Sequence, residues 1–194
     1  MFEHHIPQAH DQSYHPARRH VLLLTCMDPR LLDNVVDFMN HDNLTNRYDH
    51  LILAGSALGA LGGPDGSKPH WKQTFLDQLH ASIALHKTQD IYIIEHRHCG
   101  AYEKVFCVHE ELSDSHEDQA LEYEIHRKYA TQLADELRQI DGGDGKPLRV
   151  RTFLMDLRGR AATFLEGPMG VESAEGETGR IKKPKTKQGK KRKA

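Results

Sequence analysis

Residues 20–30 read HVLLLTCMDPR, an unbroken apolar run followed by a cysteine, an aspartate and an arginine at alternate positions. A short apolar run bounded by polar residues is typical of a β-strand that is buried on both faces, as in a parallel sheet covered by helices. Cys26, Asp28 and Arg30 then lie at the carboxyl end of this strand. Open α/β sheets bind their ligands at that end, so this stretch predicts both a fold and a site.

The rest of the central region alternates similar strands with helical periodicity. Further strands are predicted at 51–54, 90–96 and 148–157, and helices at 30–40, 70–87 and 117–139. The apolar faces of these helices are expected to include Leu32, Val36, Leu85 and Leu121. This order predicts the α/β class, with an open, mainly parallel sheet flanked by helices. Right-handed crossovers place the carboxyl ends of all its strands on one edge.

The composition predicts one folded domain between two polar ends. A chain of 194 residues is long enough for a single domain with a real core. We expect a flexible N-terminal arm at 1–19, a single α/β zinc-binding catalytic domain at 20–165 and a disordered basic tail at 166–194. The tail consists largely of Gly, Glu, Lys, Pro and Thr, which bury too little apolar surface to offset their ordering entropy.

The net charge of -2 conceals an uneven distribution. Residues 180–194 carry nine Lys or Arg and no acid, which leaves the rest of the chain acidic. The tail is suited to contact nucleic acid or an acidic partner, to act as a nuclear address, or simply to keep the chain soluble. No apolar run approaches the roughly 18 residues of a membrane span, and the N-terminus lacks the apolar segment of a secretory signal. We therefore expect a cytoplasmic protein.

Three side chains are candidates for a metal site. Cys26 ends the first strand, and His96 and Cys99 follow the third, so the sheet is expected to bring them together. Zinc prefers thiolate and imidazole ligands, and a catalytic zinc keeps one position for water. Two thiolates and a neutral imidazole balance the charge of one Zn²⁺ per chain and leave it able to acidify that water. The alternative is that these residues are simply packed in the core.

Neighbouring residues are candidates for supporting roles. Arg30 matches the carboxylate of Asp28 in a bidentate pair that would fix its orientation, and Pro29 favours an extended Asp28. An ordinary surface ion pair is the alternative. His98 is expected beside the metal site or at the surface, and Cys107 in the core.

A glycine-rich segment follows the second predicted strand, and a single glycine, Gly100, follows Cys99. The loop and substrate-pocket candidates are Ala54, Gly55, Ser56 and Gly100. A glycine after Cys99 permits close backbone approach or a positive φ. The segment GSALGALGG lacks the signatures of a phosphate loop and of a dinucleotide-binding turn, so we interpret it as a loop near the metal edge.

The motifs together resemble the β-class carbonic anhydrases. Cys26-x-Asp28-x-Arg30 follows one strand, LILAGSA lies at the next, and His96-x-x-Cys99-Gly100-Ala101 follows the third. The resemblance covers roughly residues 20–160. Pro29 stands where the family commonly has Ser, so the chain looks like a divergent member.

The resemblance implies a function and a set of roles. Cys26, His96 and Cys99 would bind zinc, and Asp28 and Arg30 would form the catalytic dyad. The reaction would be the reversible hydration of CO₂ to bicarbonate through a zinc-bound hydroxide, with the proton leaving to buffer. A homodimer or higher even oligomer is implied. In some members the aspartate is the fourth zinc ligand, which Asp28 is positioned to be.

Two other functions fit the same residues. One is a non-catalytic zinc-binding or regulatory protein of the same fold, with the basic tail as its interacting segment. The other is a hydrolase of a CO₂-like substrate, carbonyl sulfide or carbon disulfide, which share the linear shape of CO₂.

Overall fold

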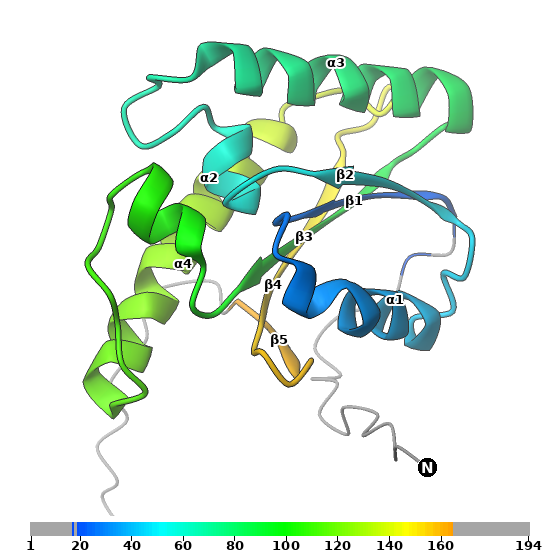
Figure 1. Cartoon of the computed structure of the whole chain (residues 1–194). Helices are drawn as coiled ribbons and strands as arrows, with labels where there is room; N and C mark the ends of the chain where they lie inside the picture. The colour runs from blue at the N-terminus through cyan, green and yellow to red at the C-terminus, as the bar shows by residue number, and fades with distance from the viewer. Residues whose placement is uncertain (1–16, 18, 165–194) are drawn as a thin grey trace, which may run out of the picture. The chain divides into compact units, whose positions relative to one another are not determined.

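Five strands form a single sheet in the computed structural model, which describes residues 17 and 19–164 (Figure 1). The strands are β1 (Val21–Thr25), β2 (Tyr48–Ile52), β3 (Asp90–His96), β4 (Arg149–Met155) and β5 (Ala161–Thr163). Their order is β2-β1-β3-β4-β5, with β1 to β4 parallel and β5 antiparallel to β4. The predicted fold class, an open and mainly parallel α/β sheet, is confirmed. The predicted tail, and the predicted arm except for Ala17 and Arg19, lie outside the described residues.

Helices cover both faces of the sheet. They are α1 (Leu32–His41), α2 (Ser56–Ala60), α3 (Pro69–His86) and α4 (His116–Leu137), with a 3₁₀ turn at Pro29–Leu31 and a π-helical turn at Ala101–Val105. Figure 1 shows α1 on one side of the sheet and α2 to α4 on the other. Within the residues that the structure describes, no helix has the length and apolar character needed to cross a membrane.

The alternation of side chains along the strands creates two cores. Leu22 and Leu24 of β1 pack with the α2, α3 and α4 side, whereas Val21 and Leu23 pack with the α1 side. All residues of β1 are buried, and so are all residues of β3. The apolar run at 20–25 therefore forms the buried strand that the sequence predicts.

The course of the chain changes direction at β1. The chain moves from β1 outward to β2 and then crosses back to place β3 on the other side of β1, with Thr25 opposite Ile94. In open α/β sheets, a crevice forms outside the carboxyl ends of the strands at such a point. The segments that follow β1 and β3 are those that contain Cys26, His96 and Cys99.

Several local predictions are wrong. The second strand is not a buried strand at 51–54 but the edge strand β2, in which no residue is fully buried and Ile52 is 46% exposed. The antiparallel β5 and the short α2 were not anticipated. Cys107 lies at the surface rather than in the core, because it follows the π-helical turn in a loop. The helices bury narrower stripes than their periodicity suggests, so four apolar residues are exposed: Leu32, Val36, Leu85 and Leu121.

Candidate metal centre

Cys26, His96 and Cys99 come together at the carboxyl ends of β1 and β3. One ligand atom from each lies within 4.8 Å of the others. The two sulfur atoms are 3.7 Å apart. Zinc–sulfur bonds of about 2.3 Å at a tetrahedral angle require a sulfur–sulfur separation of about 3.8 Å. The spacing of the two cysteines therefore fits a shared tetrahedral ion, and His96 and Cys99 are themselves buried.

The imidazole of His96 is oriented as a metal ligand would be. Its Nδ1 lies 2.9 Å from the backbone carbonyl of Arg97, which can only accept, so Nδ1 carries the proton. The lone pair is then on Nε2, which is buried and has no hydrogen-bond partner among the described residues. Metal-binding histidines usually donate their other ring N–H to a carbonyl or carboxylate in this way. The donor set fits zinc, and a metal ion would give this buried nitrogen the partner that it lacks among the described residues.

Hydrogen bonds favour the thiolate form of Cys26. The pKa of Cys26 is lowered to about 4, mainly because the Cys99 thiol donates to it, while burial acts in the opposite direction. The backbone N–H of Gly55 adds a contact to the sulfur at 3.3 Å. Gly55 has a φ of +76°, a conformation that favours glycine. The pKa of Cys99 is raised, because its hydrogen bond to Cys26 and its burial both favour the thiol. Thiolate is the form that binds metal.

Asp28 and Arg30 form the predicted pair beside these ligands. Arg30 Nε donates to Asp28 Oδ1 at 2.9 Å, and Arg30 Nη2 donates to Asp28 Oδ2 at 2.6 Å. The pKa of Asp28 is lowered to about 2, mainly by the hydrogen bond from Arg30. The carboxylate therefore stays ionised at neutral pH.

The geometry behind this pair differs from the sequence prediction. Asp28 is extended, as the following proline requires, with φ -66° and ψ 116°. The chain then turns instead of staying extended, because Pro29–Leu31 is a 3₁₀ turn that Asp28 caps by accepting the backbone N–H of Arg30 at 3.0 Å. The carboxylate lies close to the ligand set, with Oδ2 4.0 Å from His96 Nε2, but its hydrogen bonds go to Arg30.

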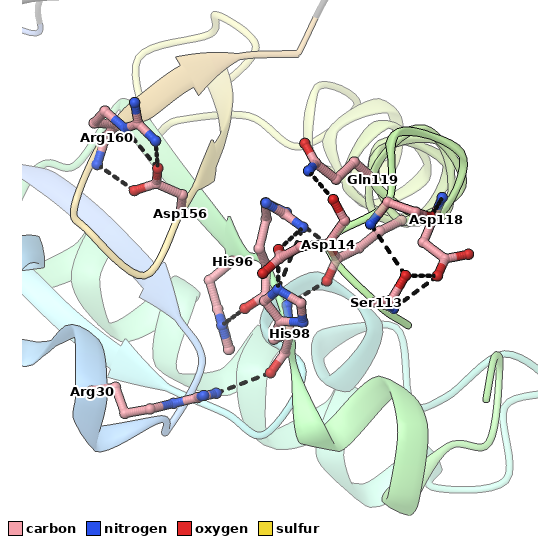
Figure 2. A network of polar contacts seen from close by, with 12 residues as sticks. Arg30, His96, His98, Ser113, Asp114, Asp118, Gln119, Asp156 and Arg160 are labelled. Carbon is pink, nitrogen blue, oxygen red and sulfur yellow. Dashed lines mark hydrogen bonds and ion pairs between the residues drawn. The ribbon is translucent and has the colours of Figure 1, made fainter. Parts of the chain in front are cut away.

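The loop between His96, the last residue of β3, and Cys99 also holds Arg30. Figure 2 shows Arg30 reaching the backbone carbonyl of His98, and the distance from Nη2 is 2.9 Å. The buried Glu122 of α4 braces the same loop by accepting from Arg97 Nε at 2.9 Å and from the backbone N–H of His98. The His98 imidazole lies 3.2 Å from Asp114, away from the ligand set.

A small apolar cavity opens next to the ligands. Its volume is ≈ 90 Å³, and its walls include Cys26, Asp28 and His96. The remaining walls are mostly apolar and come from β1, β2, β3, α1 and the connection between β1 and α1: Thr25, Met27, Pro29, Leu31, Leu32, Val35, His50, Ile52 and Ile94. Sequence reasoning missed these residues, because apolar residues on a strand or helix look like ordinary core.

A larger cavity of ≈ 560 Å³ adjoins the Asp28–Arg30 pair. It is lined by charged residues, including Glu103 and Lys104, as well as by Cys99. Asp28 and Pro29 line both cavities. Asp28 is therefore shared by an apolar space and a more polar one, whereas Arg30 lines only the second.

The four predicted loop and pocket residues take different positions. Ala54, Gly55 and Ser56 line neither of these cavities; Gly55 contacts the Cys26 sulfur from behind, and Ser56 is fully buried. Gly100 lines the polar cavity. Its φ is -60° and a Cβ there would meet open space, so the expected positive φ or close approach is not found.

A buried acid–base pair behind the ligands also escaped prediction. Glu95 precedes His96 in β3 and accepts the backbone N–H of Ala57 at 2.8 Å. Its other oxygen lies 2.8 Å from His126 Nδ1, and both side chains are buried. The signal in the sequence is an acidic residue between the apolar centre of β3 and the candidate ligand His96. This pair fixes β3 to α2 and α4 next to the ligand His96.

No family model matches this chain. A protein of Rickettsia bellii described as uncharacterized is 32% identical over 138 residues, which are 71% of this chain and 77% of that protein. An uncharacterized protein of Rickettsia conorii is 29% identical over 147 residues, 76% of this chain and 73% of that protein. Among solved structures, the β-carbonic anhydrase CafD of the fungus Aspergillus fumigatus overlays on 76% of this chain and 90% of its own, with a TM-score of 0.48 and 13% identity. The chain belongs to the same protein family as the Rickettsia bellii protein.

Proposed function

We propose that the chain is a zinc-dependent carbonic anhydrase that reversibly hydrates CO₂ to bicarbonate. One observation carries the proposal: a small apolar cavity is lined at once by the metal-ligand candidates Cys26 and His96 and by the ionised Asp28. A metal site, an oriented carboxylate and a space for an uncharged molecule therefore meet at one point. The sequence motifs that resemble the β-class carbonic anhydrases support the same reaction.

Cys26, His96 and Cys99 would hold the zinc ion. When bound, zinc acts as a Lewis acid that makes water a nucleophile at neutral pH. Two thiolates balance the charge of the ion, so the site can remain largely shielded from solvent.

Asp28 orients the attacking water. Its pKa of about 2 makes it too weak a base to remove a proton at neutral pH, but the carboxylate is a strong hydrogen-bond acceptor. By accepting one hydrogen of the water, it directs the oxygen lone pair at the carbon of CO₂. Arg30 fixes both carboxylate oxygens and so limits the rotation of Asp28. The proton released in the reaction passes to buffer.

The two cavities suit the substrate and the product. CO₂ is small, linear and uncharged, and the mostly apolar walls of the ≈ 90 Å³ cavity suit such a molecule. Bicarbonate is charged, and Arg30 and Lys104 of the polar cavity are cations that it can contact as it leaves.

We also propose that the chain forms a homodimer or a higher even oligomer. Three apolar side chains that line the apolar cavity are exposed, namely Met27, Leu32 and Ile52. A second copy that covers them would close the cavity to water. Light scattering after size-exclusion chromatography tests this, and a monomer at micromolar concentration contradicts it.

Stopped-flow CO₂ hydration on the zinc-loaded protein tests the function. A rate well above the buffer reaction, lost in Cys99→Ser and retained in Cys107→Ser, is the expected result. Zinc binding with hydrolysis of carbonyl sulfide or carbon disulfide, and no CO₂ hydration, would replace the proposal with the hydrolase. Zinc binding with neither activity would leave the non-catalytic zinc protein.

A further inference from the structure

Another cluster of metal-ligating side chains lies at the opposite edge of the sheet. His20 directly precedes β1, Asp49 lies in β2 and His86 is the last residue of α3. Figure 1 shows the end of α3 on the side where β1 and β2 begin. One ligand atom from each residue lies within 4.8 Å of the others. The strand between His20 and Cys26 places this cluster roughly 20 Å from the candidate metal centre.

The carboxylate of Asp49 lies between the two imidazoles. Its Oδ1 is 3.1 Å from His20 Nε2, and its Oδ2 is 2.8 Å from His86 Nδ1. The ring centroids of the two histidines are 4.6 Å apart. Ser82 donates to Oδ2 at 2.6 Å and is itself buried against Thr88, so the carboxylate is held in position. The three side chains are thus arranged by β1, β2 and α3 together.

The nitrogen of His20 supports a ligand at this position. His20 Nε2 is shielded from solvent and faces Asp49 Oδ1 at 3.1 Å, but the contact lacks the geometry of a good hydrogen bond. A shielded nitrogen that is poorly aligned with its partner is costly, and a metal ion held by both groups would satisfy it.

We propose that His20, Asp49 and His86 bind a second divalent transition-metal ion, zinc or a close relative such as cobalt or nickel. Two imidazoles and one carboxylate are the donors that these ions prefer. Calcium and magnesium are disfavoured, because they require a shell made almost wholly of oxygen. Water completes the coordination, since the protein supplies three donors. The ion ties the end of α3 to the edge strand β2, and its binding does not depend on the proposed hydration of CO₂.

The first test is a count of metal in the tag-free, full-length protein. After zinc loading and gel filtration, inductively coupled plasma mass spectrometry is expected to find two zinc ions per chain in the wild type and one in His86→Ala. His80→Ala is the matched control, because His80 is exposed on the same helix and belongs to neither cluster. The double variant Cys26→Ser/Cys99→Ser should retain one ion. Equal zinc in His86→Ala and His80→Ala overturns the proposal, whatever the wild-type total, and one ion in the wild type that His86→Ala loses would instead count against the Cys26, His96 and Cys99 centre.

Cobalt spectroscopy provides a second readout that does not rely on the stability of a variant. Thiolate ligands give Co²⁺ a strong near-ultraviolet absorption, which histidine and carboxylate do not. A second equivalent of Co²⁺ should therefore add visible bands without increasing the thiolate absorption, and His86→Ala should lack this increment. Saturation of all Co²⁺ bands at one equivalent in the wild type contradicts the site. CO₂ hydration, if present, should be unchanged in His86→Ala.

Discussion

Arg30 holds Asp28 through two parallel contacts, from Nε to Oδ1 at 2.9 Å and from Nη2 to Oδ2 at 2.6 Å, while Nη2 also donates to the His98 carbonyl at 2.9 Å. A guanidinium fork can satisfy both oxygens of a carboxylate at once, and an ammonium group cannot. Arg30 therefore fixes the orientation of the Asp28 carboxylate. Because Arg30 also binds the carbonyl of His98, the carboxylate is held in a set position relative to the loop between His96 and Cys99.

The loss of this orientation should reduce catalysis without removing the metal. We expect Arg30→Lys and Asp28→Asn to lower the CO₂ hydration rate by on the order of 100-fold, the scale of a positioned polar group in a reaction. Stopped-flow kinetics measures the rate, and metal analysis should show unchanged zinc. Arg158→Lys, at an exposed arginine between β4 and β5, is the control. An unchanged rate in Asp28→Asn would remove Asp28 from the mechanism.

Replacement of any one proposed ligand of the Cys26, His96 and Cys99 centre should prevent that centre from holding its ion. We expect Cys26→Ser, His96→Ala and Cys99→Ser each to bind one zinc fewer per chain than the wild type, because three protein donors are the minimum of a catalytic zinc site. Metal analysis after dialysis gives the count. Cys107→Ser is the matched control, since that cysteine is exposed. Full zinc in Cys99→Ser would refute the ligand set.

The close packing of α2 should make one glycine sensitive to substitution. A Cβ on Gly59 would lie 2.4 Å from the backbone oxygen of Ala54, so the backbone must shift. We expect Gly59→Ala to lower the free energy of unfolding by about 1–3 kcal/mol. Gly100→Ala should be neutral or slightly stabilising, because Gly100 has helical φ and open space around it. Urea unfolding of the zinc-loaded proteins compares them, and equal stabilities would contradict the clash.

Asp90 should make stability depend on pH in the acid range. Its buried carboxylate accepts from Arg149 Nε at 2.9 Å and from Arg151 Nη1 at 2.8 Å. Burial alone would raise its pKa, but the two arginines outweigh burial and lower it. The unfolded chain therefore takes up this proton at a higher pH than the folded protein does. The stabilisation is present above the unfolded pKa of about 3.9 and is lost as the pH falls through the lower folded value.

The variant Asp90→Asn isolates this contribution. At pH 7 it should cost about 2 kcal/mol, less than a fully buried pair, because Arg149 is half-exposed and can be hydrated. The difference between wild type and variant should shrink as the pH falls from 5 to 3, as measured by urea unfolding at each pH. A difference that stays constant or grows on acidification would contradict the assignment.

The strand pattern was sufficient to predict which residues meet. The buried run before Cys26 and the run ending at His96 indicate parallel strands, and parallel strands in one sheet end on the same edge. The Asp28–Arg30 pair was predicted from chemical complementarity and from an extended chain past Cys26. The pair is present, but the chain turns at Pro29–Leu31, because the Asp28 side chain caps a 3₁₀ turn there.

Burial at the edges could not be predicted in the same way. Periodicity places Leu85 on the apolar face of α3, yet Leu85 is 74% exposed, because the neighbours that would cover it are fixed by the tertiary arrangement. Similarly, the apolar segment 51–54 overlaps β2 only at Leu51 and Ile52, and the place of β2 at the end of the strand order leaves it half-exposed. The cavity walls depend on contacts between distant segments and have no local signature. The acidic residue in β3 is a local signal, but it does not indicate that its partner is His126.

The two cysteines of the metal centre lie 73 positions apart in the chain, and only the pairing of β1 with β3 brings their sulfurs to 3.7 Å. A growing polypeptide that has emerged only through Cys26 holds one sulfur ligand and cannot form the site. If these cysteines bind zinc as proposed, capture of that ion is a late event in folding, because a chain in which β1 and β3 have not paired cannot form this site.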